Sequence, residues 1–471
     1  MISPSAQYMA AFRSGATSAV LMTFSAYPRK FTSVPLGDGD AWKFPWIAKI
    51  GAYKQSANDL DGSSSISNMS VTVLDLSNLI TQDFPSVPGG FKGQKVTLQH
   101  GFVGLALAHW ITFATLVVDT VSTDSDNTAY TFNLRDQSVL LQQQIYTTGA
   151  NPNYYTSSKN PATVGPSNPM DLLTAICAAV QPALTPNAGA VAAYKAGLLS
   201  GAQIEFSLTH SETAKDFLSA EIMKPFGGYW FFNSLGQVTP YCWVPFQLPT
   251  VASSIAVSAI DQTNILKVPT ADEAALVNQV DLTMEYNQNA SFAAEDIEFQ
   301  ATSISLYNLV KSQTIDSRGQ KLNFGCWAWV RLLANALFQR YAFFSPTYDV
   351  TTFMAPAQGG AAPQNLPPAC LELGDHVFLS GTGIKNRSTG LIGLTSRLCE
   401  VKSFSKDFGK KTVELGLLDK GWLQALSPYE VAPDGTPVYA SASSAQRATY
   451  AYIGSAASGT FSTGAANEVI Y

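Results

Sequence analysis

Few residues of this chain have the types and spacing that catalysis or metal binding requires. Its four histidines are scattered and form neither an HExxH pattern nor a paired-ligand spacing; they are His100, His109, His210 and His376. The sequence also has no GxSxG nucleophile elbow and no phosphate-binding GxxxxGKS or GxxxxGKT loop. We therefore expect no catalytic residue, no cofactor-binding residue and no metal ligand.

Two acidic patterns have simple structural interpretations. Asp407-Phe408-Gly409 matches the magnesium motif of protein kinases in its letters, but no kinase catalytic loop or glycine-rich loop precedes it. It predicts a hairpin turn. Glu295 and Asp296 form a carboxylate pair of the kind that glycosidases use, but neighbours on a polar segment ordinarily form a solvated surface.

The five cysteines are widely separated and include no CxxC motif or Cys-His pair at metal spacing. This distribution predicts buried, reduced thiols, and a spatially assembled iron-sulfur site is the weaker alternative. The residues are Cys177, Cys242, Cys326, Cys370 and Cys399.

The composition points to a covered, neutral surface. Only 13% of the 471 residues are charged, about half the usual share, and the net charge is -6. Soluble monomers usually rely on surface charge, so part of this surface is expected to lie against other subunits. The net negative charge argues against tight nucleic-acid binding, although DNA could pass along such a surface.

The elements that position these residues are mostly strands. Residues 1–148 alternate apolar and polar side chains in short segments, as in a β-sandwich or barrel. The uncharged run 101–118 contains two glycines and a histidine, and we expect two strands and a loop there instead of a membrane helix. The N-terminus lacks the basic flank and apolar core of a secretory signal.

A polar, proline-rich linker is expected at 149–168, followed by a middle α+β domain at 169–274. In this domain Asn168 and Pro169 mark a helix start, residues 211–224 have a helical apolar stripe, and residues 229–244 form a hairpin. The aromatic residues 229–232 and Trp243 are expected to pack in a core or interface, with a ligand platform as the alternative.

A second β domain is expected at 275–430, and it includes a strongly apolar helix at 326–344. Residues 371–419 read as antiparallel strands joined by tight turns. Their predicted core residues are Leu373, Val377, Val413, Leu415 and Leu417. The tail, 431–471, is rich in Ser, Ala, Gly and Thr, and we expect an extended arm that a partner chain or neighbouring subunit orders. The fold class is mainly β with an α+β insertion.

Several segments, in this order, resemble the hub proteins of the tail tip or baseplate of long-tailed bacteriophages. They cover most of residues 65–420: SVTVLDLSNL, KVTLQHG, TLVVDTV and TAYTFNLRD in the first domain; NPMDLLTAI and IEFSLTHSETAKDFLSAEIMKPFGGYWFFNSLGQV in the middle; then NQVDLTMEY, LELGDHVFLSG and KKTVELGLLD.

The resemblance implies a structural virion protein without enzymatic activity or cofactor. Such hubs are homotrimers with two tube-like β domains per subunit, which adapt a six-fold tail tube to a three-fold tip. They form part of the channel for DNA and the tape-measure protein, and they anchor distal-tail and fibre or spike proteins. The resemblance also implies assembly in the bacterial cytoplasm and no membrane anchor.

Two alternatives remain open from the sequence. The first is a tail-tip module that binds a receptor or glycan through residues 229–232 and Trp243. The second, which the sequence favours less, is a cell-wall hydrolase, although no fused hydrolase domain or carboxylate motif supports it.

Overall fold

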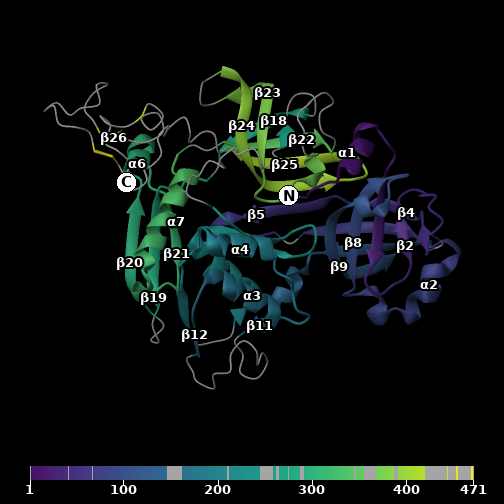
Figure 1. Ribbon diagram of the computed structural model, residues 1–471, viewed down its shortest axis with the longest axis horizontal. Coiled ribbons are helices and arrows are strands. Elements are labelled where there is room, and N and C mark those ends of the chain that lie inside the picture. Colours follow the sequence, from purple (N-terminus) through teal and green to yellow (C-terminus); the bar gives the residue numbers. More distant parts are fainter. Residues whose placement is uncertain are drawn as a thin grey trace.

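The computed structural model describes residues 2–40, 42–65, 67–145, 162–208, 212–243, 258–260, 265–273, 275–286, 291–343, 346–354, 367–386, 391–419, 443, 452–453 and 468–469. It is mainly β, as predicted, with one large mixed sheet and smaller α+β parts beside it. Figure 1 shows the N-terminal strands at the right, strands β22 to β25 above the centre, and helix α7 with β19, β20 and β21 at the left.

The first β region builds one half of the large sheet. Its central strands run in the order β5-β7-β10-β9-β8-β1-β2-β3, and most neighbours are antiparallel. Helices α1 (Ala6–Arg13) and α2 (Leu79–Asp83) belong to this region. The strands are β1 (Ser18–Phe24), β2 (Lys30–Thr32), β3 (Lys43–Phe44), β4 (Ile47–Ile50), β5 (Tyr53–Asn58), β6 (Ser63–Ser64), β7 (Asn68–Leu74), β8 (Lys95–Phe102), β9 (Ile111–Thr123) and β10 (Ala129–Arg135).

The run 101–118 forms the end of β8, a loop with a short 3-10 turn and the start of β9, so the prediction of two strands and a loop is confirmed. Within the described residues, no helix has the length and apolar character needed to cross a membrane.

The second β region continues the same sheet. The strands β23, β24 and β25 form an antiparallel meander, and β22 pairs with β25. Strand β24 also pairs with β5 of the first region, from Ser403↔Ser56 to Lys406↔Tyr53, so the two regions share one sheet. The strands are β17 (Ser258–Ile260), β18 (Ile265–Glu273), β22 (Pro346–Phe353), β23 (His376–Asn386), β24 (Leu391–Asp407) and β25 (Thr412–Asp419).

One apolar core spans both regions. It joins residues of the first region, such as Phe113 and Phe132, to residues of the second, such as Val377 and Val401. The core residues predicted for 371–419 are all buried: Leu373, Val377, Val413, Leu415 and Leu417. The alternation that predicted these strands therefore reports their inward faces correctly.

The inserted α+β part has its own core. Asn168 caps α3 through a hydrogen bond from the Met170 backbone N–H, and Pro169 occupies the first helical position, as predicted. The elements are β11 (Gln144–Ile145), β12 (Ala162–Ser167), α3 (Pro169–Ala179), α4 (Ala188–Ala196), β13 (Ile204–Leu208), β14 (Glu212–Thr213), α5 (Ala214–Phe217), β15 (Gly228–Phe232) and β16 (Val238–Cys242).

Two predictions in this part need correction. Residues 162–167, predicted as linker, form β12, which pairs with β13 because the two extended segments satisfy each other's backbone groups. The helix predicted over 211–224 is broken: α5 passes into a π-helical segment, Leu218–Met223, and then into a 3-10 turn, Lys224–Phe226, which contains Pro225. The predicted stripe is nevertheless buried, at Ala214, Phe217, Leu218 and Ile222.

Residues 279–341 form a further sheet with a separate core. The three strands run in the order β20-β19-β21, and α7 packs on one face through Val330, Leu333 and Leu337. The elements are β19 (Gln279–Tyr286), β20 (Phe292–Phe299), α6 (Ala301–Tyr307), β21 (Ser312–Asp316) and α7 (Cys326–Tyr341). The predicted apolar helix is thus confirmed.

The predicted division into domains stays a prediction. The linker residues 149–161 and most of the C-terminal arm at 431–471 lie outside the described residues. Within the arm, β26 (Tyr452–Ile453) pairs with β27 (Glu468–Val469).

Candidate functional site

The β15–β16 hairpin is the place where the inserted part meets the large sheet. Its turn is set by local chemistry, because the Asn233 side-chain oxygen accepts hydrogen bonds from the backbone N–H groups of Leu235 (3.1 Å) and Gln237 (2.9 Å). Gly236 then has a positive φ of 71°, a backbone conformation that residues with a side chain rarely adopt. The hairpin therefore presents a fixed turn to its surroundings.

The first β region binds this turn by two side chains. The Thr115 hydroxyl of β9 donates to the Ser234 carbonyl (2.9 Å), and the Gln137 amide donates to the Gly236 carbonyl (2.9 Å). Both hydrogen bonds are buried, so losing either donor would leave a buried carbonyl without its partner.

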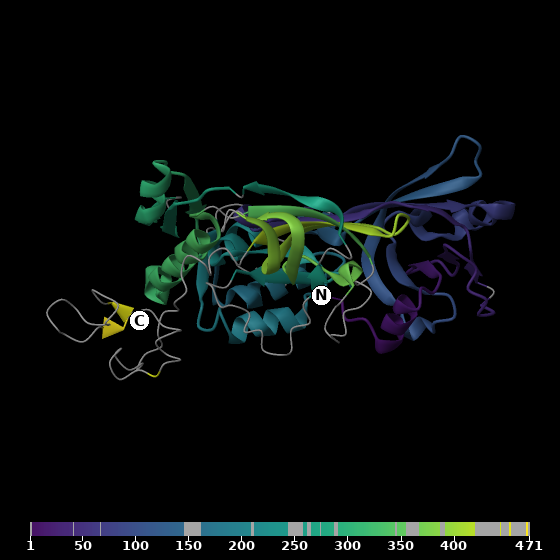
Figure 2. The same ribbon diagram turned by 90° about the horizontal axis from the view of Figure 1, so that it is seen from above.

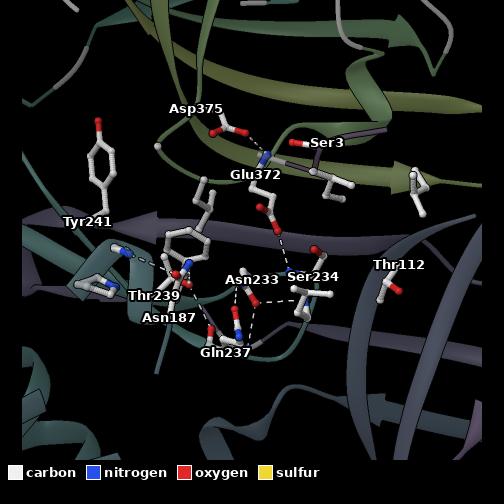
Figure 3. Close-up of a pocket in the computed structure, with 18 of the residues that line it drawn as sticks. Ser3, Thr112, Asn187, Asn233, Ser234, Gln237, Thr239, Tyr241, Glu372 and Asp375 are labelled. Atoms are coloured by element: carbon white, nitrogen blue, oxygen red, sulfur yellow. Dashed lines mark hydrogen bonds between the residues drawn. The ribbon is translucent and has the colours of Figure 1, made fainter. Parts of the chain in front are cut away.

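The second β region binds the same turn through a carboxylate. The Ser234 backbone N–H donates to Glu372 Oε1 (2.7 Å), and the Glu372 backbone N–H donates to Asp375 Oδ2 (2.8 Å). Gly374 between them has φ of 79°, and a Cβ there would lie 2.5 Å from the Tyr241 ring. Figure 3 shows these residues around one pocket.

The pocket has a volume of about 710 Å³ and lies between the hairpin, the N-terminal segment, helix α4 and the turn that contains Glu372 and Asp375. Amide, hydroxyl and carboxylate groups form much of its wall. Its labelled polar residues in Figure 3 are Ser3, Thr112, Asn187, Asn233, Ser234, Gln237, Thr239, Tyr241, Glu372 and Asp375.

The two acids of the pocket serve the fold. Burial, together with the nearby charge of Glu372, raises the pKa of Asp375 to about 6. Each acid also accepts a backbone hydrogen bond that holds a turn in place. Lys406 of β24, which is fully buried, favours ionisation of Glu372, while burial lowers the pKa of Lys406 itself.

A buried group of four charges joins α7 to the large sheet. Arg340 donates to both oxygens of Glu400 (3.0 and 2.9 Å) and to Asp59 Oδ2 (3.1 Å). Lys402 and the Tyr341 hydroxyl also contact Asp59 Oδ2. Although burial opposes ionisation, Lys402 and Arg340 hold the pKa of Asp59 below its ordinary value. Two cations and two anions therefore balance one another.

A second ionic contact joins the loop after β21 to the inserted part. Arg318 donates to both oxygens of Glu212 (2.6 and 2.7 Å) and to Glu221 Oε1 (2.7 Å). Glu221 is buried, and burial raises its pKa although Arg318 favours the ionised form. The paired guanidinium geometry fixes both distance and orientation.

The aromatic residues that the sequence offered as a ligand platform are in the interior. Residues 229–232 and Trp243 are at most 4% exposed. Tyr229 stacks near Tyr241, with ring centroids 5.1 Å apart, and Trp230 donates to the Ser219 hydroxyl (2.9 Å). The alternative prediction of a ligand platform formed by these aromatic residues is therefore wrong, because the adjoining parts of the protein cover both strands.

The five cysteines and His100 lie in the interior. All five cysteines are buried and unbridged. His100 is buried, bonds the Tyr8 hydroxyl (2.7 Å), and has a pKa lowered by burial to about 4. His210 lies outside the described residues. No group of three or more His, Cys, Asp or Glu residues suited to a metal ion occurs within the described ranges.

Asp407-Phe408-Gly409 forms the predicted turn after β24. The Phe408 ring lies 3.8 Å from that of Phe113, centroid to centroid, and Asp407 Oδ1 accepts from the Lys410 N–H (2.9 Å). Glu295 is exposed, as predicted, whereas Asp296 is half-buried with one oxygen that accepts no hydrogen bond.

The ionic residues that connect the parts were not predicted from the sequence. Arg340 offered one signal, since it is a charged residue next to the buried Tyr341 in a helix that is otherwise mostly apolar. Its partners Asp59 and Glu400 are distant in sequence and carried no such signal.

Together these observations define a mainly β protein in which two β regions share a sheet and an inserted part is fixed against both by a hairpin and buried ion pairs. No family model matches the sequence, and no curated protein matches it.

Solved structures similar to this one include three described as tail proteins. The tail protein from Neisseria meningitidis MC58 is 11% identical, with 87% of this chain and 99% of that chain covered and a TM-score of 0.46. The 43 kDa tail protein of prophage MuSo2 from Shewanella oneidensis is 11% identical, with 87% and 100% covered and a TM-score of 0.45. A prophage tail protein from Listeria monocytogenes EGD-e is 10% identical, with 85% and 94% covered and a TM-score of 0.41.

Proposed function

We propose that this chain is a structural virion protein, the hub of the tail tip or baseplate of a long-tailed bacteriophage. In this role it closes the tail tube, adapts its six-fold symmetry to a three-fold tip and forms part of the DNA channel. The proposal rests on the resemblance of the sequence segments above and on the way the two β regions are joined.

The single observation that carries the proposal is the pairing of β24 with β5. A tube wall requires neighbouring β units to be joined side by side at a fixed angle. Here two β regions of one chain are joined in this way, by backbone hydrogen bonds and a shared core. Three copies would supply six such units, which supports a homotrimer that continues a six-fold tube.

The charge distribution fits a conduit. A net charge of -6 and a low content of charged residues provide few lysine or arginine contacts that would retain passing DNA. The partners in this proposal are the tape-measure protein, the distal tail protein and fibre or spike proteins, and DNA is only a transient occupant. Assembly takes place in the bacterial cytoplasm, and the final location is the virion.

Electron microscopy of the intact particle tests this function. We expect density for three copies around an open axial channel at the distal end of the tail, with β5 and β24 in the wall. A monomer in the particle, or a trimer without an axial channel, would refute the hub function.

A zymogram tests the enzymatic alternative separately. We expect no clearing of peptidoglycan by the purified chain. Clearing that disappears when Glu372 or Asp375 is changed to the corresponding amide would establish a hydrolase at the pocket instead.

A further inference from the structure

The three-stranded sheet leaves one long strand open along its outer side. β20 pairs with β19 from Gln279↔Phe299 to Tyr286↔Phe292 without a bulge, and β21 lies on the far side of β19. Within the described part of the chain, no strand pairs with the other edge of β20. In Figure 1 β20 is the leftmost strand of this three-stranded sheet. As far as the described residues extend, its edge can therefore take another strand.

This edge has only some of the features that usually prevent pairing with another chain. Proteins block exposed edges with charged side chains, especially lysine, and with proline, bulges or short strands. β20 has eight residues, and its sequence, FAAEDIEF, contains no lysine and no proline, while its three charged residues are all acidic. Such an edge repels a second acidic strand but accepts strand addition by a segment of opposite charge.

The outward face of β20 carries exposed apolar residues. Ile297 is 50% exposed and Phe299 is 60% exposed, whereas the intervening residue Glu298 points towards α7 and pairs with Arg331 (3.7 Å). Further exposed apolar side chains follow directly in α6 and the turn after it, namely Leu306, Leu309 and Val310. Exposed apolar side chains gathered in one stretch of the chain are typical of an interaction surface.

The same sheet is strongly acidic. Strands β19, β20 and β21 contain six carboxylates and no lysine or arginine; the acids are Asp281, Glu285, Glu295, Asp296, Glu298 and Asp316. On the outward face, Asp281 lies opposite Ile297, and Thr283 lies opposite Glu295. Acidic and apolar groups are therefore neighbours on the outward face, next to the edge where an added strand would lie.

We propose that β20 is a docking edge for an extended, basic segment of another protein. The backbone of the segment pairs with β20 as a fourth strand. Its apolar side chains lie beside Ile297 and Phe299, and its lysine or arginine side chains face Glu295. Nucleic acid does not suit this surface, because its phosphates would meet the carboxylates. The inference rests on this sheet alone and does not depend on the hub function.

Peptide binding to the full chain tests the proposal. The probe is a short fluorescein-labelled peptide built on Lys-Thr-Val-Thr-Val, in which the lysine and both valines point to one face of a strand, and the comparison peptide has glutamate in place of lysine. We expect anisotropy to show binding of the basic peptide only. Hydrogen exchange is expected to slow about tenfold or more at the β20 amides in the complex, because strand addition protects backbone N–H groups.

Two variants locate the binding. Ile297→Lys places a like charge on the edge and is expected to weaken the basic peptide about tenfold or more. Ile392→Lys is the matched control, since Ile392 is also a solvent-facing isoleucine of a strand, in β24 and 72% exposed, and binding should be unchanged. Circular dichroism verifies that both variants are folded.

Four results would overturn the proposal. They are the absence of binding, equal binding of the acidic peptide, binding without protection of the β20 amides, and equal weakening by Ile297→Lys and Ile392→Lys.

Discussion

Replacing Arg340 with methionine removes the buried guanidinium that joins α7 to the large sheet. In the native chain Arg340 and Lys402 balance Asp59 and Glu400. The variant leaves one more anion than cation in this group, and Glu400 is 0% exposed. The removed side chain also contributes three hydrogen bonds and a cation–π contact, 5.0 Å from the Trp243 ring centroid.

Removing one partner of a buried ion pair costs about 3–5 kcal/mol, because the remaining charge loses its compensation without regaining water. We therefore expect Arg340→Met to lower the free energy of unfolding of the unit that contains α7 by this amount. Urea titration followed by tryptophan fluorescence measures it, since Trp243 packs against the guanidinium.

Arg331→Met is the matched control on the same helix. Its ion pair with Glu298 is 3.7 Å long, and the Arg331 side chain is 68% exposed, so the expected cost is about 0–1 kcal/mol. The double variant Arg340→Met/Glu400→Leu removes a cation and an anion together and should recover part of the loss. Equal costs for the two arginine variants, or no recovery in the double variant, would refute the role assigned to this group.

Three further changes test other parts of the fold. Gly374→Ala should cost about 1–3 kcal/mol in urea unfolding, because φ is positive and the new Cβ would meet the Tyr241 ring; a neutral result would contradict this packing. Phe408→Ala should cost about 3–5 kcal/mol through loss of its contact with Phe113, as thermal unfolding can measure. Burial lowers the pKa of His100 from 6.5 to about 4, so the folded state disfavours protonation. Stability present above pH 6.5 should therefore fall by about 3 kcal/mol as the pH decreases to 4, and the His100→Gln variant should lack this part of the loss.

Local patterns in the sequence predicted the strands and their inward faces well. Val413 and Leu415 alternate with Thr412, Glu414 and Gly416, and all the apolar positions of this alternation are buried. Such a pattern predicts a strand whenever one face of the sheet is covered, whatever covers it. The start of α3 was predictable for a similar reason, because Asn168 and Pro169 act on the nearest turn of the helix. The prediction that Phe408 lies in a turn also depended on neighbours alone.

Non-local pairings were beyond such patterns. The contact of β24 with β5 joins Ser403 to Ser56, and neither strand contains a residue that specifies its partner. Residues 162–167 were predicted as linker because their composition is polar, yet pairing with β13 satisfies their backbone. The positions of Asp59 and Glu400 beside Arg340 likewise depend on the complete fold.

The inserted part is fixed by directional polar contacts at several points, in addition to apolar packing. On one side, the hairpin turn accepts hydrogen bonds from the side chains of Thr115 and Gln137. On the other side, its Ser234 N–H donates a hydrogen bond to Glu372. Arg318 contacts Glu212 and Glu221, which belong to the inserted part. Apolar contacts tolerate small rotations, whereas a bidentate ion pair and a buried backbone hydrogen bond each require a particular distance and angle. The arrangement therefore fixes both the distance and the angle between the parts.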